Sequence, residues 1–129
     1  MRTLTNHKLN GLDDAITITV MDEPGQGGAC HVYEMKLEPG PDAGHPIPIQ
    51  QQMQTVYFQN GPIKEAGVNG VSQEALLSVL IDRLQSFQAG QFSCRENAVA
   101  LTHLESAMMW LQKRTRDRLA RGVEGTNIK

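Results

Sequence analysis

The sequence contains few cysteines and no long apolar run. Cys30 and Cys94 lie in unrelated patterns without a second pair nearby, so we interpret them as buried or free thiols in a reducing cytosol rather than as a disulfide framework. No apolar stretch approaches the roughly 20 residues that a membrane-spanning helix needs. Arg2 is not followed by an apolar segment of signal-peptide length. We therefore expect a soluble, intracellular protein that does not enter a membrane.

The sequence also lacks the spacings that metal binding and catalysis need. Its histidines are His7, His31, His45 and His103. None of them has metal-ligand spacing, and the sequence shows no Ser/His/Asp or Cys/His arrangement typical of nucleophilic catalysis. Asp13 and Asp14 are adjacent, so on a strand their side chains would point to opposite faces instead of forming a catalytic pair. We expect no catalytic residue, no metal and no cofactor.

Charge is distributed unevenly along the 129 residues, whose net charge is −2. Residues 1–111 contain six Lys/Arg and twelve Asp/Glu, a net charge of −6, whereas residues 112–129 contain six Lys/Arg and two Asp/Glu, a net charge of +4. A protein that binds duplex DNA or RNA usually carries a basic stripe along a whole surface. Positive charge concentrated in a few helical turns suits a compact anion better.

The first half of the chain has the pattern of a small antiparallel sheet. Residues 16–20 alternate with period two, and residues 31–37 do so less cleanly, which predicts a hairpin. Residues 38–50 contain four prolines and two glycines and are predicted to form a loop. A third strand is predicted over residues 53–59.

Helical spacing replaces this alternation after residue 70. Ser72 is a candidate N-cap and Gly90 a stop signal, which together predict a first helix over residues 73–89. The apolar residues expected on one stripe of this helix are Leu77, Leu80, Leu84 and Phe87.

A second, longer helix is predicted after a connection of three residues. Ser93 and Glu96 have the S-x-x-E spacing of a capping box. The apolar seam then continues at intervals of four and three through Asn97, Leu101, Leu104, Met108 and Leu111. Such a short connection favours an antiparallel helical hairpin, and the spacing of the seam favours packing against a second hairpin. We expect one α+β domain over residues 1–129, with a β-rich part at 1–70 and the hairpin with its tail at 71–129.

The second helix becomes basic towards its end. Arg114, Arg118 and Arg121 follow an i, i+4, i+7 spacing, so their guanidinium groups can converge and donate in pairs to phosphate oxygens. The alternative is a solvated helix end whose positive charges complement the helix dipole. Trp110 precedes Arg114 by four residues and could stack on it under either interpretation.

Two further features allow a functional and a structural interpretation. Asn97 occupies a seam position beside the predicted place of Phe87, and an amide next to an aromatic ring suits a nucleobase. The alternative is that Asn97 fixes the register of the helices while Phe87 fills the core. Residues 59–70 are rich in glycine and amides, which allows close approach of a ligand, but they match neither phosphate-loop motif.

Several segments closely resemble the first-described phage Thoeris anti-defence proteins. The segments are residues 58–70, 94–98, 111–118 and 122–126. The resemblance covers about residues 55–126. The predicted helical hairpin is also similar to that of the phage sponge that sequesters cyclic oligonucleotides from CBASS immunity.

This resemblance implies a protein that binds glyco-cyclic ADP-ribose, the signal of bacterial TIR-domain immune enzymes, and withholds it without cleaving it in the host cytoplasm. It implies homodimers, or hexamers built from three dimers, with pockets between protomers. In some members separate pockets bind cyclic trinucleotides. Phe87 would stack on the base, Asn97 would hydrogen-bond the ligand, and Arg114 with Arg118 would meet phosphates. The implied wall residues are Asn69, Gly70, Gly125 and Thr126.

Two other classes of function stay open. A phage enzyme that hydrolyses cyclic nucleotides would need a positioned base and usually a metal. A small phage nucleic-acid-binding protein would have a DNA affinity that falls steeply with salt. The missing His/Asp cluster argues against the first class, and the acidic overall charge argues against the second.

Overall fold

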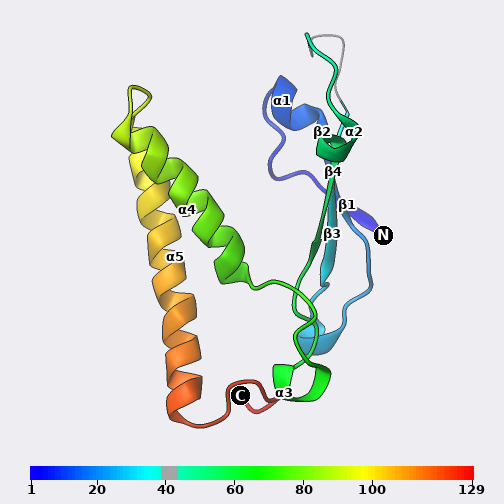
Figure 1. The fold of residues 1–129 in the computed structure, drawn as a ribbon, viewed down its shortest axis with the longest axis vertical. Helices are drawn as coiled ribbons and strands as arrows, with labels where there is room; N and C mark the ends of the chain where they lie inside the picture. Colours follow the sequence, from blue (N-terminus) through cyan, green and yellow to red (C-terminus); the bar gives the residue numbers. More distant parts are fainter. Residues whose placement is uncertain (39–43) are drawn as a thin grey trace. The chain divides into compact units, whose positions relative to one another are not determined.

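The structure is a computed structural model that describes residues 1–38 and 44–129 (Figure 1). The chain divides into two compact units, Met1–Gly61 with Val68–Gly70 and Pro62–Gly67 with Val71–Lys129. We call them the sheet unit and the helical unit. The expected arrangement of residues 1–129 as a single domain stays a prediction.

The sheet unit contains a four-stranded antiparallel sheet with the order β1-β2-β3-β4. The strands are β1 (Arg2–Leu4), β2 (Ile16–Val20), β3 (Val32–Leu37) and β4 (Met53–Tyr57). The central register places Ile18 opposite both Leu4 of β1 and Met35 of β3. The predicted antiparallel sheet is confirmed, as is the β2–β3 hairpin. Strand β1 was not predicted, because three residues are too few to show alternation.

A carboxylate holds the turn between β2 and β3. Asp22 Oδ2 accepts a hydrogen bond from the backbone N of His31 at 2.9 Å, and Oδ1 accepts one from Val32 N at 3.1 Å. These donors, His31 first, lower the pKa of Asp22 below its ordinary value. Within the turn lies the short 3₁₀ helix η1 (Gln26–Gly28). Its residue Gly27 has φ 76°, a left-handed backbone conformation that other residues rarely adopt.

Short helices fill the connections. They are α1 (Gly11–Asp14), α2 (Ile49–Gln52) and α3 (Ile63–Ala66). The loop predicted over residues 38–50 lies partly outside the described residues, and its last two residues begin α2. Single-turn helices have no amphipathic period from which they could be predicted.

The helical unit contains two long helices, α4 (Gln73–Ala89) and α5 (Arg95–Ala120), which form the predicted antiparallel hairpin (Figure 1). Ser72 caps α4 as predicted, since its hydroxyl accepts from Ala75 N at 3.1 Å. The prediction of a capping box that begins at Ser93 was wrong. The N-cap of α5 is Cys94, whose sulfur accepts from Asn97 N at 3.4 Å, while Cys94 N donates to Gln88 Oε1 at 3.0 Å. That bond fixes the first turn one residue later than the motif predicts.

The seam of α5 follows the predicted spacing and continues beyond it. The half-buried or buried residues at intervals of four and three are Asn97, Leu101, Leu104, Met108, Leu111, Thr115 and Arg118. On α4, Leu77 and Leu84 are half-buried as expected, together with Ile81. Leu80 is 48% exposed, so its placement in the buried stripe was wrong. The packed row of α4 contains Ile81 instead, which keeps the interval of four and three.

Candidate ligand-binding site

A shallow, positively charged depression lies at the C-terminal end of α5. Its volume is about 440 Å³, and it is lined by Trp110, Lys113, Arg114, Asp117, Arg118, Arg121 and Lys129. Five of these residues are basic and one is acidic. Such a surface attracts anions.

Arg114 and Lys129 line this depression with side chains that pair with no other described residue, and Arg114 is the one of the two that lies on α5. Its side chain is exposed and makes no hydrogen bond or ion pair within the part of the chain that the structure describes. By contrast, Lys113 Nζ pairs with Asp117 Oδ2 at 2.7 Å, and the guanidinium of Arg121 donates to the backbone oxygen of Lys129. The guanidinium of Arg114 is therefore free to donate to an incoming anion.

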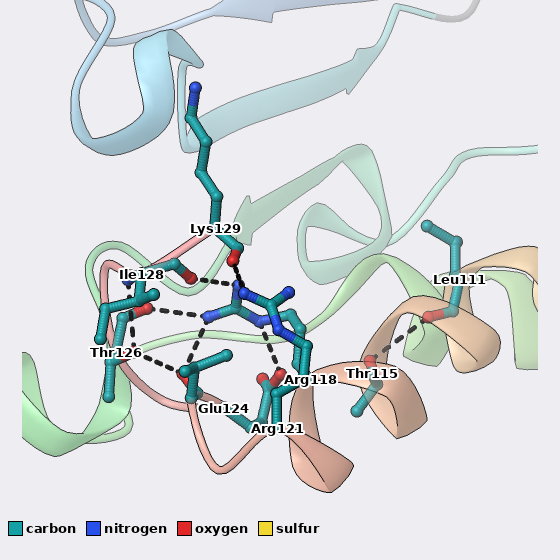
Figure 2. Close-up of polar contacts among 9 residues, drawn as sticks. Leu111, Thr115, Arg118, Arg121, Glu124, Thr126, Ile128 and Lys129 are labelled. Atoms are coloured by element: carbon teal, nitrogen blue, oxygen red, sulfur yellow. Dashed lines mark hydrogen bonds and ion pairs between the residues drawn. The ribbon is translucent and has the colours of Figure 1, made fainter.

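Arg118 lies beside Arg114 in the lining but is used differently, because it is only 7% exposed. Its Nε donates to Glu124 Oε2 at 2.9 Å, and its Nη2 donates to the backbone oxygens of Val123 and Thr126, both at 3.0 Å (Figure 2). Its Nη1 donates to the backbone oxygen of Ile128. All these acceptors lie in residues 122–129, which we call the tail segment. A buried guanidinium needs such partners.

The tail segment packs on α3 within the helical unit. Lys64 N donates to the backbone oxygen of Gly125 at 3.1 Å. Gly125 is buried at φ 81°, and a Cβ there would lie 3.0 Å from Ile63 Cγ1. Backbone conformation and close approach both require glycine at this position. Thr126 follows it with its hydroxyl donating to the backbone oxygen of Val123.

The other end of the hairpin contains Phe87 and Asn97. Phe87 lies half-buried in the last turn of α4, and the guanidinium of Arg83 lies 5.0 Å from its ring centroid. Asn97 lies half-buried in the first turn of α5, and its side-chain amide makes no hydrogen bond among the described residues. The bond between Gln88 and Cys94 ties these two turns together. The structure thus places Phe87 and Asn97 at the same end.

Asn69 and Gly70 belong to the sheet unit. The side chain of Asn69 accepts from Asn60 N at 2.8 Å and donates to Asn60 O at 2.7 Å, while its backbone N donates to Gln59 Oε1 at 2.9 Å. A Cβ on Gly70 would lie 2.4 Å from the carbonyl carbon of Phe58, so no other residue fits there without rearrangement. The loop is therefore held in one conformation by its own residues.

The candidate residues of the helical unit form two separate groups. Asn97 and Arg114 are seventeen positions apart on one helix, which at 1.5 Å per residue is about 25 Å. A pocket of a few hundred Å³ is only about 7 to 10 Å across. One small ligand therefore cannot contact both groups of the same chain.

Two neighbours of the predicted residues were missed. Glu124 is the ion-pair partner of Arg118. Its position as an acidic residue close to several basic ones was the feature of the sequence that could have predicted this pair. Arg83 precedes Phe87 by four residues, a spacing that brings side chains together on a helix.

Two further properties concern residues 1–38 and 44–129. No group of three or more His, Cys, Asp or Glu residues in these ranges could hold a metal ion. No helix there combines the length and the apolar composition that crossing a bilayer requires.

Comparison with known proteins identifies the hairpin. Residues 53–116 match the family model described as Acb2/Tad1, hairpin domain. It is 56% identical over 78 residues to Thoeris anti-defense 1 of Bacillus phage SBSphiJ7. The aligned part is 60% of this chain and 55% of that protein, so the chain matches about half of the length of its relative. The resemblance to the phage Thoeris anti-defence proteins is confirmed.

Proposed function

We propose that this protein is a phage anti-defence sponge that binds glyco-cyclic ADP-ribose in the host cytoplasm and withholds it from its effector without cleaving it. The observation that carries the proposal is the unoccupied Arg114 in a basic depression, on a hairpin that matches the Acb2/Tad1 family model. The name of the relative, Thoeris anti-defense 1, supports the same role.

The chemistry of the ligand matches the side chains that the hairpin offers. A cyclic ADP-ribose isomer carries two phosphates and an adenine, so it needs cationic donors, an aromatic face and amide hydrogen bonds. Arg114 supplies the phosphate-binding guanidinium, and Arg118 lines the same depression. Phe87 and Asn97 supply the stacking face and the amide for the base. Gly125 and Thr126 are the wall residues that the helical unit supplies in this proposal, and the role of Asn69 and Gly70 of the sheet unit stays a prediction.

The separation of about 25 Å between Asn97 and Arg114 makes a second chain necessary. We call the end of the hairpin that contains Phe87 and Asn97 the loop end, and the end that contains Arg114 and Arg118 the basic end. Two hairpins packed antiparallel about a twofold axis would bring the loop end of each next to the basic end of the other. Each dimer would then have two equivalent pockets, each with walls from both chains. Dimerisation is thus part of the binding mechanism, and a hexamer would contain three such dimers.

Exposed apolar side chains on α4 support an oligomer. Leu76, Val79 and Leu80 are exposed on α4, and Arg83 and Phe87 continue the Leu76–Leu80 row at intervals of three and four. A partner that covers this row would reach Phe87.

Cyclic di- or trinucleotides form a second candidate ligand class. The description of the family model covers both Acb2 and Tad1, and five basic side chains line the depression. Repeated in an oligomer, these cations would provide several phosphate contacts. Calorimetry that detects no heat with any such nucleotide would remove this ligand class.

The experiment that tests the proposal distinguishes binding from hydrolysis. The protein is incubated with glyco-cyclic ADP-ribose, freed of unbound ligand and denatured by heat, and the supernatant is chromatographed. We expect intact ligand to be recovered from the unmutated protein, and far less from the Arg114→Ala variant treated in parallel. Recovery of a hydrolysed product would support the enzyme alternative. Competition by duplex DNA would support the nucleic-acid-binding alternative.

A further inference from the structure

Arg118 differs from every other basic residue of the depression because its guanidinium already donates four hydrogen bonds within the chain. The acceptors belong to Glu124, Val123, Thr126 and Ile128. A guanidinium has five N–H donors. A phosphate that approached Arg118 would have to displace a carboxylate and carbonyl oxygens that already satisfy a buried charge.

These bonds link three parts of the helical unit. Arg118 lies at the end of α5, its acceptors lie in the tail segment, and the tail segment is bonded to α3 through Lys64 N and Gly125 O. Asn127 Nδ2 adds a bond to Glu65 Oε2 at 3.2 Å. The position of Gly125 and Thr126 therefore depends on the pair formed by Arg118 and Glu124 (Figure 2).

We propose that Arg118 is a positioning residue: together with Glu124 it fixes the tail segment against α5 and α3, and Arg114 alone of the two arginines binds phosphate. The pair holds Gly125 and Thr126 as a wall of the pocket, and Glu124 compensates the charge of Arg118. The expected effect on ligand binding rests on the proposed function. The role of the pair in holding the tail segment can be tested without any ligand.

The amide of Lys64 reports directly on tail docking. Its acceptor, Gly125 O, lies in the tail segment, so its hydrogen exchange rate rises when the tail segment leaves α3. The amide of Ala66 serves as an internal control, because its acceptor, Pro62 O, lies at the start of α3 itself. Both rates can be measured by NMR in the full-length protein.

We expect Arg118→Lys, which keeps the charge but loses the fork of donors, to raise the Lys64 exchange rate about tenfold, and Glu124→Gln to raise it by a smaller factor. Both variants should weaken binding of glyco-cyclic ADP-ribose about threefold to tenfold. Arg114→Ala should leave the Lys64 rate unchanged while it weakens binding by more than about tenfold.

The sign of the Glu124→Gln effect separates the two roles of Arg118. If Arg118 bound phosphate directly, removing the neighbouring carboxylate charge would strengthen binding, whereas a positioning role predicts weaker binding. Stronger binding by Glu124→Gln would overturn the proposal, as would an unchanged Lys64 rate in both variants. If the unmutated protein does not bind the probe, the proposed function is wrong, and the Lys64 rates still decide whether the pair holds the tail segment.

Discussion

The two ends of the helical hairpin use their polar side chains in opposite ways. At the loop end, the amide of Asn97 makes no hydrogen bond among the described residues, and the exposed row of α4 leads to Phe87. At the basic end, Arg118 donates four hydrogen bonds to the tail segment, while the guanidinium of Arg114 donates none among the described residues. In the part of the chain that the structure describes, the amide of Asn97 and the guanidinium of Arg114 are both left without partners, and under the proposed function each end presents part of a nucleotide site that is completed by a second chain.

The largest effect is expected where the two ends are brought together. Leu80→Arg places a charge in the exposed row of α4 that we propose the partner covers. Burying an uncompensated charge costs about 3 to 5 kcal/mol, so we expect a monomer that no longer binds glyco-cyclic ADP-ribose. Sedimentation and calorimetry measure both properties.

The matched control for this variant is Leu12→Arg. Leu12 is 66% exposed on α1 in the sheet unit, outside the proposed interface. We expect this variant to keep the oligomeric state and the ligand affinity of the unmutated protein. A Leu80→Arg protein that stays oligomeric and binds normally would show that α4 does not form the interface.

The next largest effect is expected at the basic end. Arg114→Ala removes a charged hydrogen bond to phosphate, which weakens binding by about 1.5 to 3 kcal/mol. Arg114→Lys should recover part of the loss, because a lysine keeps the charge but not the paired donors. Titration calorimetry gives both affinities. Unchanged affinity in a folded Arg114→Ala protein would mean that the phosphate is bound elsewhere.

A smaller effect is expected at the loop end. Base stacking on an aromatic ring is worth about 1 to 3 kcal/mol, and Phe87→Leu keeps the apolar volume but loses the aromatic face. We expect its affinity to fall by about 1 to 2 kcal/mol. Phe92→Leu is the control at the same end, since Phe92 is exposed in the connection between the helices and should leave affinity unchanged. Equal losses in both variants would contradict a specific stack on Phe87.

The smallest effect concerns how the loop end is held. Sulfur is a poor helix cap compared with a hydroxyl, so Cys94→Ser should raise the free energy of unfolding by about 0.5 to 1 kcal/mol. Ligand affinity should not change. Denaturant unfolding measures the difference, and Cys30→Ser, which caps no helix, should show no gain. A destabilised Cys94→Ser protein would indicate that the thiol has another role.

The sequence predicted the features that depend on local periodicity. Ser72 and Gly90 bounded α4 correctly, and the spacing from Asn97 to Leu111 identified the seam. The start of α5 was misjudged because the bond from Cys94 to Gln88 depends on how the two helices meet. Sequence spacing cannot contain that information.

The basic end could be predicted only in part. The spacing of Arg114 and Arg118 indicated a convergent pair of cations, and both do line one depression. Their different use depends on backbone oxygens of Val123, Thr126 and Ile128, and a backbone acceptor leaves no signature in the sequence. The short elements β1 and α3 were missed because they are too short to show a period.

The central claim is that the loop end of one chain and the basic end of another form one pocket. It is tested most directly by a heterodimer of an Arg114→Ala chain and an Asn97→Ala chain, purified through two different tags and titrated with glyco-cyclic ADP-ribose. A shared pocket predicts that half of the sites bind with unmutated affinity, because one pocket combines the intact Asn97 of the first chain with the intact Arg114 of the second. If each pocket belonged to a single chain, no site of unmutated affinity would be found, which would contradict the account.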